Sequence, residues 1–359
     1  MAYTTIDDPE AYFQVQLYTG DGSDDHAIAL DGDTDMQPDL VYIKNRDTGD
    51  NPAMFDTIRG VTKYIGGVTA AEVTDADTLD AFQSDGFKTD DDDITNTNTE
   101  KYLALCWKAG TTASGTTTGS GTGKAYSSTY NDTSKFQITG YLGNGTSGHT
   151  IPVGLSTAPK ALWCKSRGTG EWILYHHKLT VAPETEYQKH STPVAVDDVA
   201  AWNDTEPSSS IVTFGDLASH NGDDVASVMY AWDEVQGFSK FGHVTGNGSN
   251  DGPFVYCGFR PALVINRKYA GTAGTTNMWN DESNNSQNVM DALQYVGHTD
   301  AEAGTAASPQ VTYQIDFLSN GFKFRGYRAD TNTSGVKHIF WAFAKSPFVN
   351  SNGVPGTAL

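Results

Sequence analysis

Two short stretches of the chain place an indole ring beside an amide and a carboxylate: Trp202, Asn203 and Asp204, and Trp279, Asn280 and Asp281. A sugar stacks its apolar face on an aromatic ring and directs its hydroxyls to short polar side chains. If the chain binds a glycan, we expect the site on loops where such rings are exposed. The alternative, which the residues alone favour, is that each Trp closes a sheet end or a contact between subunits.

Alternating carboxylates predict one metal site, at Asp31, Asp33 and Asp35. Such carboxylates can converge on a hard cation, and calcium is the ion that this spacing fits. The pattern then departs from a calcium loop, because Met36 occupies the place of the turn glycine. We expect no other cofactor, and the run from Asp90 to Asp93 is interpreted as a solvated acidic tip.

The remaining chemical motifs favour structure over catalysis. His176 and His177 follow an apolar run, so strand alternation sends one side chain inward and the other outward. Gly143 to Gly148 matches G-x-G-x-x-G, but Ile151-Pro152 follows where a helix is required, so a tight turn is predicted. No G-x-S-x-G, P-loop or H-E-x-x-H motif is present, and we expect no enzyme.

Net charge limits the classes of partner that we expect, and the cysteines indicate whether disulfides form. The formal net charge of −21 repels nucleic-acid backbones and anionic lipid, so we expect no nucleic acid and no membrane insertion. No signal peptide is expected at Met1. Cys106, Cys164 and Cys257 each lie within or beside an apolar strand, which predicts buried free thiols rather than a disulfide framework.

The elements that must position these residues occur three times. The stretches Gln37–Arg46, Ala158–Arg167 and Arg260–Lys268 each begin near a proline, continue with an apolar run and end in basic or polar residues. Because proline removes a ladder donor, this pattern predicts a core strand that starts from a loop.

A Gly-x-Gly motif precedes each of these strands. Its first glycine is Gly20, Gly143 or Gly246, and the proline follows the second glycine by 16, 14 and 13 residues. The first glycines are 123 and 103 residues apart, which suits a small domain and is too long for a solenoid unit.

Short alternating aromatic runs and the near absence of helical periodicity predict an all-β fold, built as three tandem antiparallel β-sandwich domains. The predicted parts are a leader 1–11, repeat one 12–110, a Gly/Ser/Thr-rich linker 111–135, repeat two 136–237, repeat three 238–348 and a C-terminal arm 349–359. The linker, read as flexible or as an extended crossing, tethers repeats one and two, whereas repeats two and three should dock rigidly.

The repeats predict equivalent positions. Pro38, Pro159 and Pro261 should each start a strand. In the same way, we expect Trp107, Trp232 and Phe343 in the cores of the three domains.

Five motifs of repeat one stand in order and carry a family resemblance: Tyr18–Ser23, Pro38–Arg46, Phe55–Tyr64, Ser84–Phe87 and Ala104–Ala109. This combination resembles the repeated concanavalin-like domains of tailed-phage virion proteins, notably marine and cyanobacterial ones. The resemblance implies a lectin-like, jelly-roll fold and a virion component, and it supplies no binding residues.

The expected function is therefore a non-enzymatic structural and adhesive protein at the virion surface, as a fibre, tail appendage or capsid decoration. Its ligand would be a host-surface polysaccharide. The alternatives are a virion-associated glycan depolymerase and a purely architectural decoration protein without a ligand.

The expected partners are other virion proteins and further copies of the chain. A homo-oligomer is predicted, with a trimer favoured by the resemblance. Its contacts should lie in the least charged stretches, 111–122 and 346–359, acting as arms between subunits.

Overall fold

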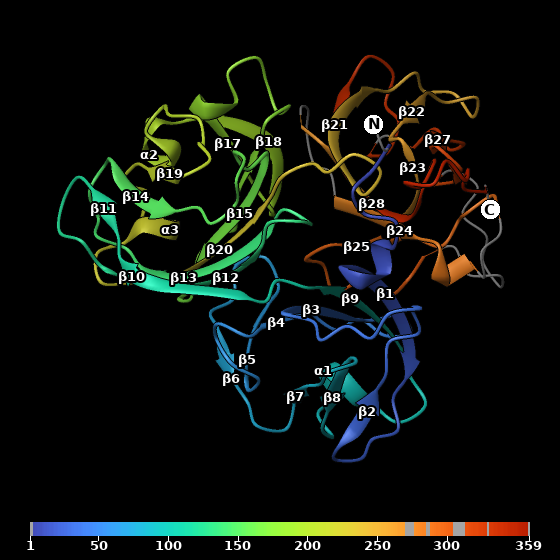
Figure 1. Ribbon diagram of the computed structural model, residues 1–359, viewed down its shortest axis with the longest axis horizontal. Coiled ribbons are helices and arrows are strands. Elements are labelled where there is room, and N and C mark those ends of the chain that lie inside the picture. The colour runs from blue at the N-terminus through green and yellow to red at the C-terminus, as the bar shows by residue number, and fades with distance from the viewer. Residues whose placement is uncertain (1–2, 270–275, 285–287, 304–312, 329, 358–359) are drawn as a thin grey trace.

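The computed structural model describes residues 3–269, 276–284, 288–303, 313–328 and 330–357. Antiparallel strands make up three lobes around a common centre, which confirms the all-β prediction (Figure 1). The helices in these residues are single turns: α1 Asp93–Asn96, α2 Val199–Trp202, α3 Ala218–Asn221, and the 3-10 turns η1 Pro9–Ala11, η2 Pro183–Thr185 and η3 Glu282–Asn284. Within the described ranges, no helix has the length and hydropathy to cross a membrane.

Repeat one forms a six-stranded sheet, β1-β9-β3-β4-β5-β6, and a three-stranded sheet, β2-β8-β7. Its strands are β1 Phe13–Thr19, β2 His26–Ile28, β3 Leu40–Asn45, β4 Ala53–Asp56, β5 Lys63–Gly66, β6 Val73–Thr74, β7 Leu79–Phe82, β8 Phe87–Thr89 and β9 Lys101–Trp107.

Repeat two and the stretch before it form an eight-stranded sheet, β10-β12-β13-β20-β15-β16-β17-β18, and a three-stranded sheet, β11-β14-β19. The strands are β10 Thr111–Thr116, β11 Thr118–Gly119, β12 Ala125–Asn131, β13 Phe136–Leu142, β14 His149–Pro152, β15 Ala161–Ser166, β16 Ile173–His176, β17 Glu186–Lys189, β18 Thr192–Asp197, β19 Ile211–Phe214 and β20 Ala226–Trp232.

Repeat three forms a five-stranded sheet, β21-β28-β23-β24-β25, and a three-stranded sheet, β22-β27-β26. Its strands are β21 Ser239–Thr245, β22 Phe254–Tyr256, β23 Phe259–Lys268, β24 Thr276–Asn280, β25 Gln294–Tyr295, β26 Ile315–Leu318, β27 Gly321–Phe324 and β28 Lys337–Pro347.

The predicted linker is corrected by these ladders. Residues 111–116 form β10, which pairs along its whole length with β12, and residues 118–119 form β11 beside β14. A Thr-rich segment without a core-forming pattern is ordered here because backbone ladder bonds hold it, and β-branched side chains suit a pleated strand. Repeats one and two are therefore not joined by a free tether.

The three larger sheets share one strand order, since the first strand of each repeat pairs with its last strand, which in turn pairs with the proline-led strand. The ladders also agree in register. The opposed pairs are Trp107 with Leu40, Trp232 with Ala161, and Phe343 with Leu263.

The prolines occupy equivalent places, because they lie two residues before Leu40, Ala161 and Leu263 of these pairs. Pro38 and Pro159 precede their strands, as predicted. Pro261 instead lies within β23, where the register with β28 shifts. A strand interrupted at proline keeps its ladder by such an irregularity.

Each Gly-x-Gly motif docks on a buried asparagine from the far end of its own repeat. These three residues, the asparagine clasps, are Asn96, Asn221 and Asn332. Each side-chain oxygen accepts the N–H of the residue between the glycines, over 2.9, 3.1 and 2.9 Å. A Cβ on Gly20, Gly143 or Gly246 would lie 2.2 to 2.3 Å from a backbone oxygen, so only glycine fits. The motifs are turns, as predicted, and β14 rather than a helix follows the second one.

Each repeat has its own hydrophobic cluster between its two sheets. In repeat one, for example, Val41 and Phe55 of the larger sheet pack with Phe87 of the smaller one. Each of these clusters contains one cysteine: Cys106 in repeat one, Cys164 in repeat two and Cys257 in repeat three. All three thiols are free and buried, as predicted, and burial raises the pKa of each.

The opposite faces of the three larger sheets meet in one shared core. Trp107, Trp232 and Phe343 lie there and not in the separate clusters, which corrects the prediction. The ring centroid of Trp107 is 6.2 Å from that of Trp232 and 5.5 Å from that of Phe343. Because strand residues alternate between faces, a strand buried on both sides places every second side chain in the shared core and the side chains between them in the cluster of its own repeat.

Polar contacts tie the three repeats together in cyclic order. Arg46 of repeat one donates to Glu302 of repeat three over 3.0 and 2.8 Å. Arg167 of repeat two forms the same two-bond pair with Glu72 of repeat one. Arg267 of repeat three donates to the backbone of repeat two, including the Thr192 carbonyl at 2.6 Å. The basic ends of the repeated strands are thus the junctions between repeats.

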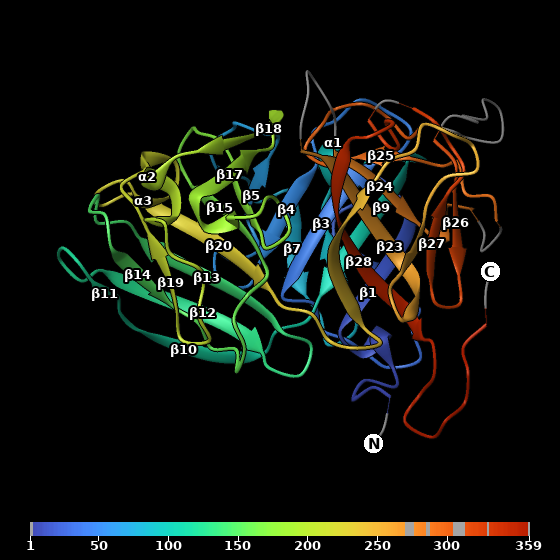
Figure 2. The ribbon, with the colours of Figure 1, turned by 90° about the horizontal axis from the view of Figure 1, so that it is seen from above.

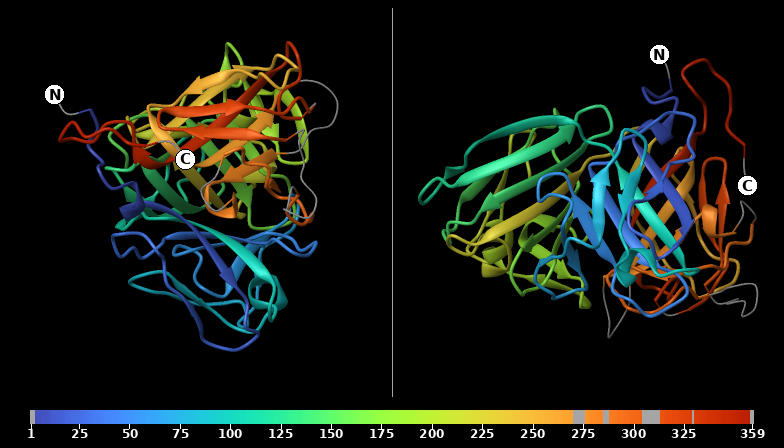
Figure 3. Two further views of the ribbon diagram at one scale, coloured as in Figure 1. Left: turned by 90° about the vertical axis from the view of Figure 1, so that its right-hand side faces the viewer. Right: turned by 90° about the horizontal axis from the view of Figure 1, so that it is seen from below.

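The two ends of the chain close this arrangement beside repeat three (Figure 3). In the leader, the Thr4 hydroxyl donates to the Gln236 carbonyl over 2.7 Å, and Glu10 accepts from Lys345 over 2.8 Å. The predicted C-terminal arm folds back as a turn, in which Val349 pairs with Pro355, and the N–H of Ser351 reaches Asp7. The described part of the tail is therefore not extended.

Candidate functional site

An exposed aromatic surface lies on the smaller sheet of repeat three. Phe254 and Tyr256 of β22 are 46% and 54% exposed, which is unusual for rings in a strand. They are two residues apart and share a face, while Val255 between them packs against the cluster of repeat three. Both rings consequently lie on the outer face of the sheet.

Charged side chains border these rings. Phe254 lies opposite Lys323 in the ladder, and the Lys323 ammonium is 2.7 Å from the Asp251 carboxylate. Arg325 lies 4.0 Å from Asp251 and donates to Asp316 over 2.5 Å. We call the group Phe254, Tyr256, Asp251, Lys323 and Arg325 the aromatic platform.

The electrostatics of the platform keep its carboxylate charged. The hydrogen bond from Lys323 lowers the pKa of Asp251, and the nearby positive charges of Lys323 and Arg325 act in the same direction. An ionised carboxylate accepts hydrogen bonds only, whereas Lys and Arg donate only. The platform therefore presents both acceptors and donors beside two apolar ring faces.

The leader holds Tyr256 in place. The Tyr3 hydroxyl donates to the Gly258 carbonyl over 2.9 Å, so in its 3.0 Å contact with the Tyr256 hydroxyl it is the acceptor. Burial raises the pKa of Tyr3 to about 12, so its hydroxyl keeps the proton that it donates to Gly258. Fixing the phenol in this way limits the rotamer entropy that the ring would lose when a ligand stacks on it.

The platform is particular to repeat three. Strand β14 holds the corresponding place in repeat two, but it contains no Phe, Tyr or Trp, and β11 covers its edge. In repeat one, Ile28 lies opposite Phe87 as Val255 lies opposite Phe322, so the places of Phe254 and Tyr256 are taken by Ala27 and Ala29, which carry no ring. The exposed rings were not identified from the sequence, where the alternation Phe254-Val255-Tyr256 after Gly252-Pro253 was the available signal.

The predicted stacking rings are not exposed. Trp202 is 1% exposed and Trp279 is fully buried, and both indoles donate to backbone carbonyls, of Glu186 at 3.0 Å and Tyr313 at 2.9 Å. The prediction of exposed rings is wrong for both residues. Each Trp packs inside the cluster of its own repeat.

The polar neighbours of these indoles also have local roles. Asn203 ends α2 in the left-handed conformation, Asp204 follows it with φ of 45°, and Asn280 accepts the N–H of Ser283 over 2.8 Å. Asp281 is fully buried, 3.6 Å from Arg260, and burial raises its pKa to about 7. The structure does not bring the two predicted triplets together.

The predicted metal ligands do not converge. Asp31, Asp33 and Asp35 are exposed on one loop. In the part of the chain that the structure describes, no group of three or more His, Cys, Asp and Glu side chains could hold a metal ion. Alternate carboxylates need a tight loop to share a cation, and Met36 is instead buried in the cluster of repeat one.

The paired histidines are structural. His176 is buried and shares a hydrogen bond with the Phe340 carbonyl at 3.2 Å, and His177 is partly buried and bonds the Phe241 carbonyl at 2.8 Å. Burial lowers the pKa of both. The two rings reach strands of repeat three, so they contribute to the junction between repeats two and three.

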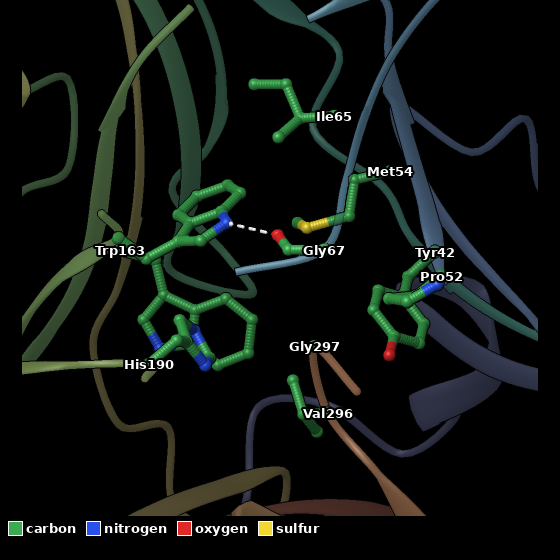
Figure 4. A pocket seen from close by; sticks show the side chains of 10 residues that line it. Tyr42, Pro52, Met54, Ile65, Gly67, Trp163, His190, Val296 and Gly297 are labelled. Atoms are coloured by element: carbon green, nitrogen blue, oxygen red, sulfur yellow. Dashed lines mark hydrogen bonds between the residues drawn. The ribbon is translucent and has the colours of Figure 1, made fainter. Parts of the chain in front are cut away.

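A narrow cavity lies where the three repeats meet (Figure 4). Tyr42, Met54, Trp163, His190 and Val296 are among its lining residues, and Figure 4 also shows an indole bonded to the Gly67 carbonyl, over 3.3 Å. Its volume of about 10 Å³ is room for a single water at most. It is too small to bind a sugar.

A polar groove between repeats one and two is larger, about 470 Å³, and is lined by Gln37, Asp39, Thr57, Ile58, Lys108, Gly110, Thr112 and Thr129. The carboxylate in this groove, Asp39, already accepts hydrogen bonds from the Thr57 hydroxyl at 2.9 Å and the Ala109 N–H at 2.8 Å. Burial raises the pKa of Asp39. The groove offers hydroxyls and an amide but no aromatic ring.

One family model matches the chain, over residues 8–347, and its description is a domain of unknown function, DUF7483. No curated protein matches the chain. The match spans all three repeats as one unit, including the junction residues and the platform.

Proposed function

The chain belongs to the DUF7483 family, whose function is unknown. From the aromatic platform and the sequence resemblance, we propose that it is a non-enzymatic structural and adhesive protein of a phage particle surface. In this proposal each repeat is a β-sandwich of the concanavalin-like, jelly-roll type. The particle location, as fibre, tail appendage or capsid decoration, rests on the sequence resemblance alone. Host-surface polysaccharide is the proposed ligand.

The platform is the observation that carries the adhesive part. Two neighbouring exposed rings, Phe254 and Tyr256, offer stacking faces, and Asp251, Lys323 and Arg325 offer hydrogen bonds to sugar hydroxyls. A single shallow site of this kind binds weakly, and many copies on one particle raise the avidity through effective concentration. The shared core and the ion pairs between repeats support this role, because they hold the platform in one orientation relative to the rest of the chain.

The proposed partners are other virion proteins and, in a homo-oligomer, further copies of the chain. The trimer expected from the resemblance remains a prediction. The chain itself already sets three repeats around one centre, so a single copy could also match a threefold position on a particle (Figure 1).

Binding and turnover on host polysaccharide test the proposal together. The purified chain should retain labelled polysaccharide in a sedimentation assay, and Phe254→Ala with Tyr256→Ala should weaken retention roughly tenfold or more, because the stacking area is lost. Val199→Ala changes an exposed residue of repeat two and should bind as the unchanged chain does. Tyr256→Phe keeps the ring but loses the hydrogen bond with Tyr3, so it should weaken retention far less than the double alanine change does.

Three outcomes contradict parts of the proposal. Shortening of the polysaccharide in size-exclusion chromatography would identify a depolymerase. A purely architectural protein would show no retention by any variant. Immunogold imaging of intact particles should place the chain at the particle surface, and its absence there would refute the virion assignment.

A further inference from the structure

Strand β10 is an open sheet edge that projects from the molecule. Its one ladder is with β12, at the end of the eight-stranded sheet, and it runs along the outer margin in Figure 2. All six of its residues, Thr111 to Thr116, are exposed. A strand exposed on both faces covers no core of its own, so its place at the edge needs another explanation.

The ladder shows which backbone groups face outward. Thr117 donates to the Lys124 carbonyl over 2.7 Å, and the pairing with β12 continues from there without a shift. Because these groups alternate along an antiparallel ladder, the N–H and C=O groups of residues 115, 113 and 111 point toward β12. Those of Thr112, Ser114 and Thr116 point away from it. Among the described residues, the outward N–H and C=O groups of these three have no hydrogen-bond partner.

The charge pattern indicates that a second copy of the chain pairs with this edge. The chain has a formal net charge of −21, so two copies repel each other over most of their surface. Residues 109–131 contain no Asp or Glu, and the one charged residue there, Lys124, is paired with Asp223 and Asp224. The strand itself thus presents no like charge to a second copy, and the carboxylates beside it have partners: Asp39, in the groove lined by Thr112, accepts two hydrogen bonds, and Asp223 and Asp224 pair with Lys124.

The edge is also complementary to itself. An antiparallel copy centred on Ser114 places Thr112 opposite Thr116 of the other copy, and every outward N–H then meets an outward C=O. Paired β-branched side chains stabilise such cross-strand positions. Ala113 and Gly115 are small, so nothing bulky opposes the approach.

We propose that β10 joins two copies of this chain edge to edge, antiparallel, about a twofold axis at Ser114. The contact is independent of glycan binding and of the virion assignment. A six-residue edge buries less than the ~1,600 Å² of a standard interface, so the dimer forms in a concentration-dependent way. Salt strengthens it, because salt screens the repulsion between the acidic copies while the edge itself contains no ion pair.

Sedimentation equilibrium tests the contact. The unchanged chain should pass from 38.6 kDa towards twice that mass as concentration rises, and more readily at high salt. Ser114→Pro removes the central outward N–H and leaves the ladder to β12 intact, so it should abolish the dimer. Ser114→Ala keeps the N–H and should dimerise as the unchanged chain does.

A charge pair tests the register without proline. Thr112→Lys with Thr116→Lys sets two ammonium groups opposite each other at both ends and should lower the association constant roughly tenfold or more. Thr112→Lys with Thr116→Glu sets opposite charges there and should restore it. A chain that stays monomeric at every concentration and salt, an oligomer that Ser114→Pro leaves unchanged, or equal association of the two charge variants would each overturn the proposal.

Discussion

Single residues explain why the Gly-x-Gly motifs recur. The sequence predicts a turn at each motif, and the positive φ of Gly22, Gly145 and Gly248 agrees with it. It does not reveal the asparagine clasps, because Asn96 is 75 residues from the Asp21 N–H that it accepts. Asparagine is common in loops, so its type alone carries no signal. Only the fold shows that it is buried and bonded.

Replacing Asn96 with Ala should lower the free energy of unfolding by about 2 to 4 kcal/mol, because the buried groups of the Gly-x-Gly turn lose their partner. Asn96 also donates to the Ser23 carbonyl over 3.0 Å, and its side-chain oxygen accepts from the His26 ring at 2.8 Å. Asn98→Ala is the matched control, since Asn98 is exposed in the same Thr-Asn-Thr-Asn-Thr run. Urea denaturation measures both, and equal losses would refute the clasp.

A buried histidine predicts a dependence of stability on pH. Both ring nitrogens of His338 lack a partner in the described structure, and burial, with Lys268 nearby, lowers its pKa to about 4. The unfolded chain binds a proton near pH 6.5, but the folded chain does not until about pH 4. Stability is therefore lost as pH falls through this window, by roughly 3 kcal/mol for one such group.

His338→Phe should remove that loss. We expect the variant to gain about 2 kcal/mol relative to the unchanged chain on going from pH 8 to pH 5, as measured by urea denaturation at each pH. His220, whose pKa burial also lowers to about 4, keeps its own share of the slope in the variant. An unchanged pH profile would show that His338 takes up a proton in the folded state.

Among the elements, the repeated strand was recognised from its proline and apolar run, but the role of its basic end was not. Arg46 and Arg167 occupy equivalent places, and each reaches a glutamate of a neighbouring repeat. Glu302 is far along the sequence from Arg46, so no local pattern links them. The linker prediction failed for a related reason. Amino-acid composition indicates how much side-chain surface a segment can bury, whereas β10 is held in place by backbone hydrogen bonds to β12.

Arg46→Ala should destabilise the chain by about 2 to 4 kcal/mol, because the Glu302 carboxylate, 5% exposed, is left without its two-bond partner. Adding Glu302→Gln to Arg46→Ala should recover part of the loss, since the unpaired buried charge is removed. A double-mutant cycle from guanidinium unfolding gives the coupling energy. Additive losses would mean that the pair does not hold repeats one and three together.

In the whole molecule, the three repeats detected in the sequence share one core, whereas a tether was expected between repeats one and two. Aromatic residues such as Trp107 were expected to be buried, and they are. Which core they enter depends on the face that each strand turns to its neighbours, and a strand that is apolar throughout does not specify this. The exposed rings of the platform were missed for the converse reason, since Phe254 and Tyr256 have the composition of core residues.

The shared core predicts cooperative behaviour that separate domains would not show. Trp107→Ala should lower the free energy of unfolding by about 3 to 5 kcal/mol, because a large ring that contacts Phe136, Trp232 and Phe343 leaves a cavity. Hydrogen exchange should then quicken in β9, β20 and β28, one strand from each repeat. Phe87→Ala creates a similar cavity in the separate cluster of repeat one and should quicken exchange there first. If Trp107→Ala instead loosened repeat one alone, with β20 and β28 protected as before, the shared core would not couple the repeats.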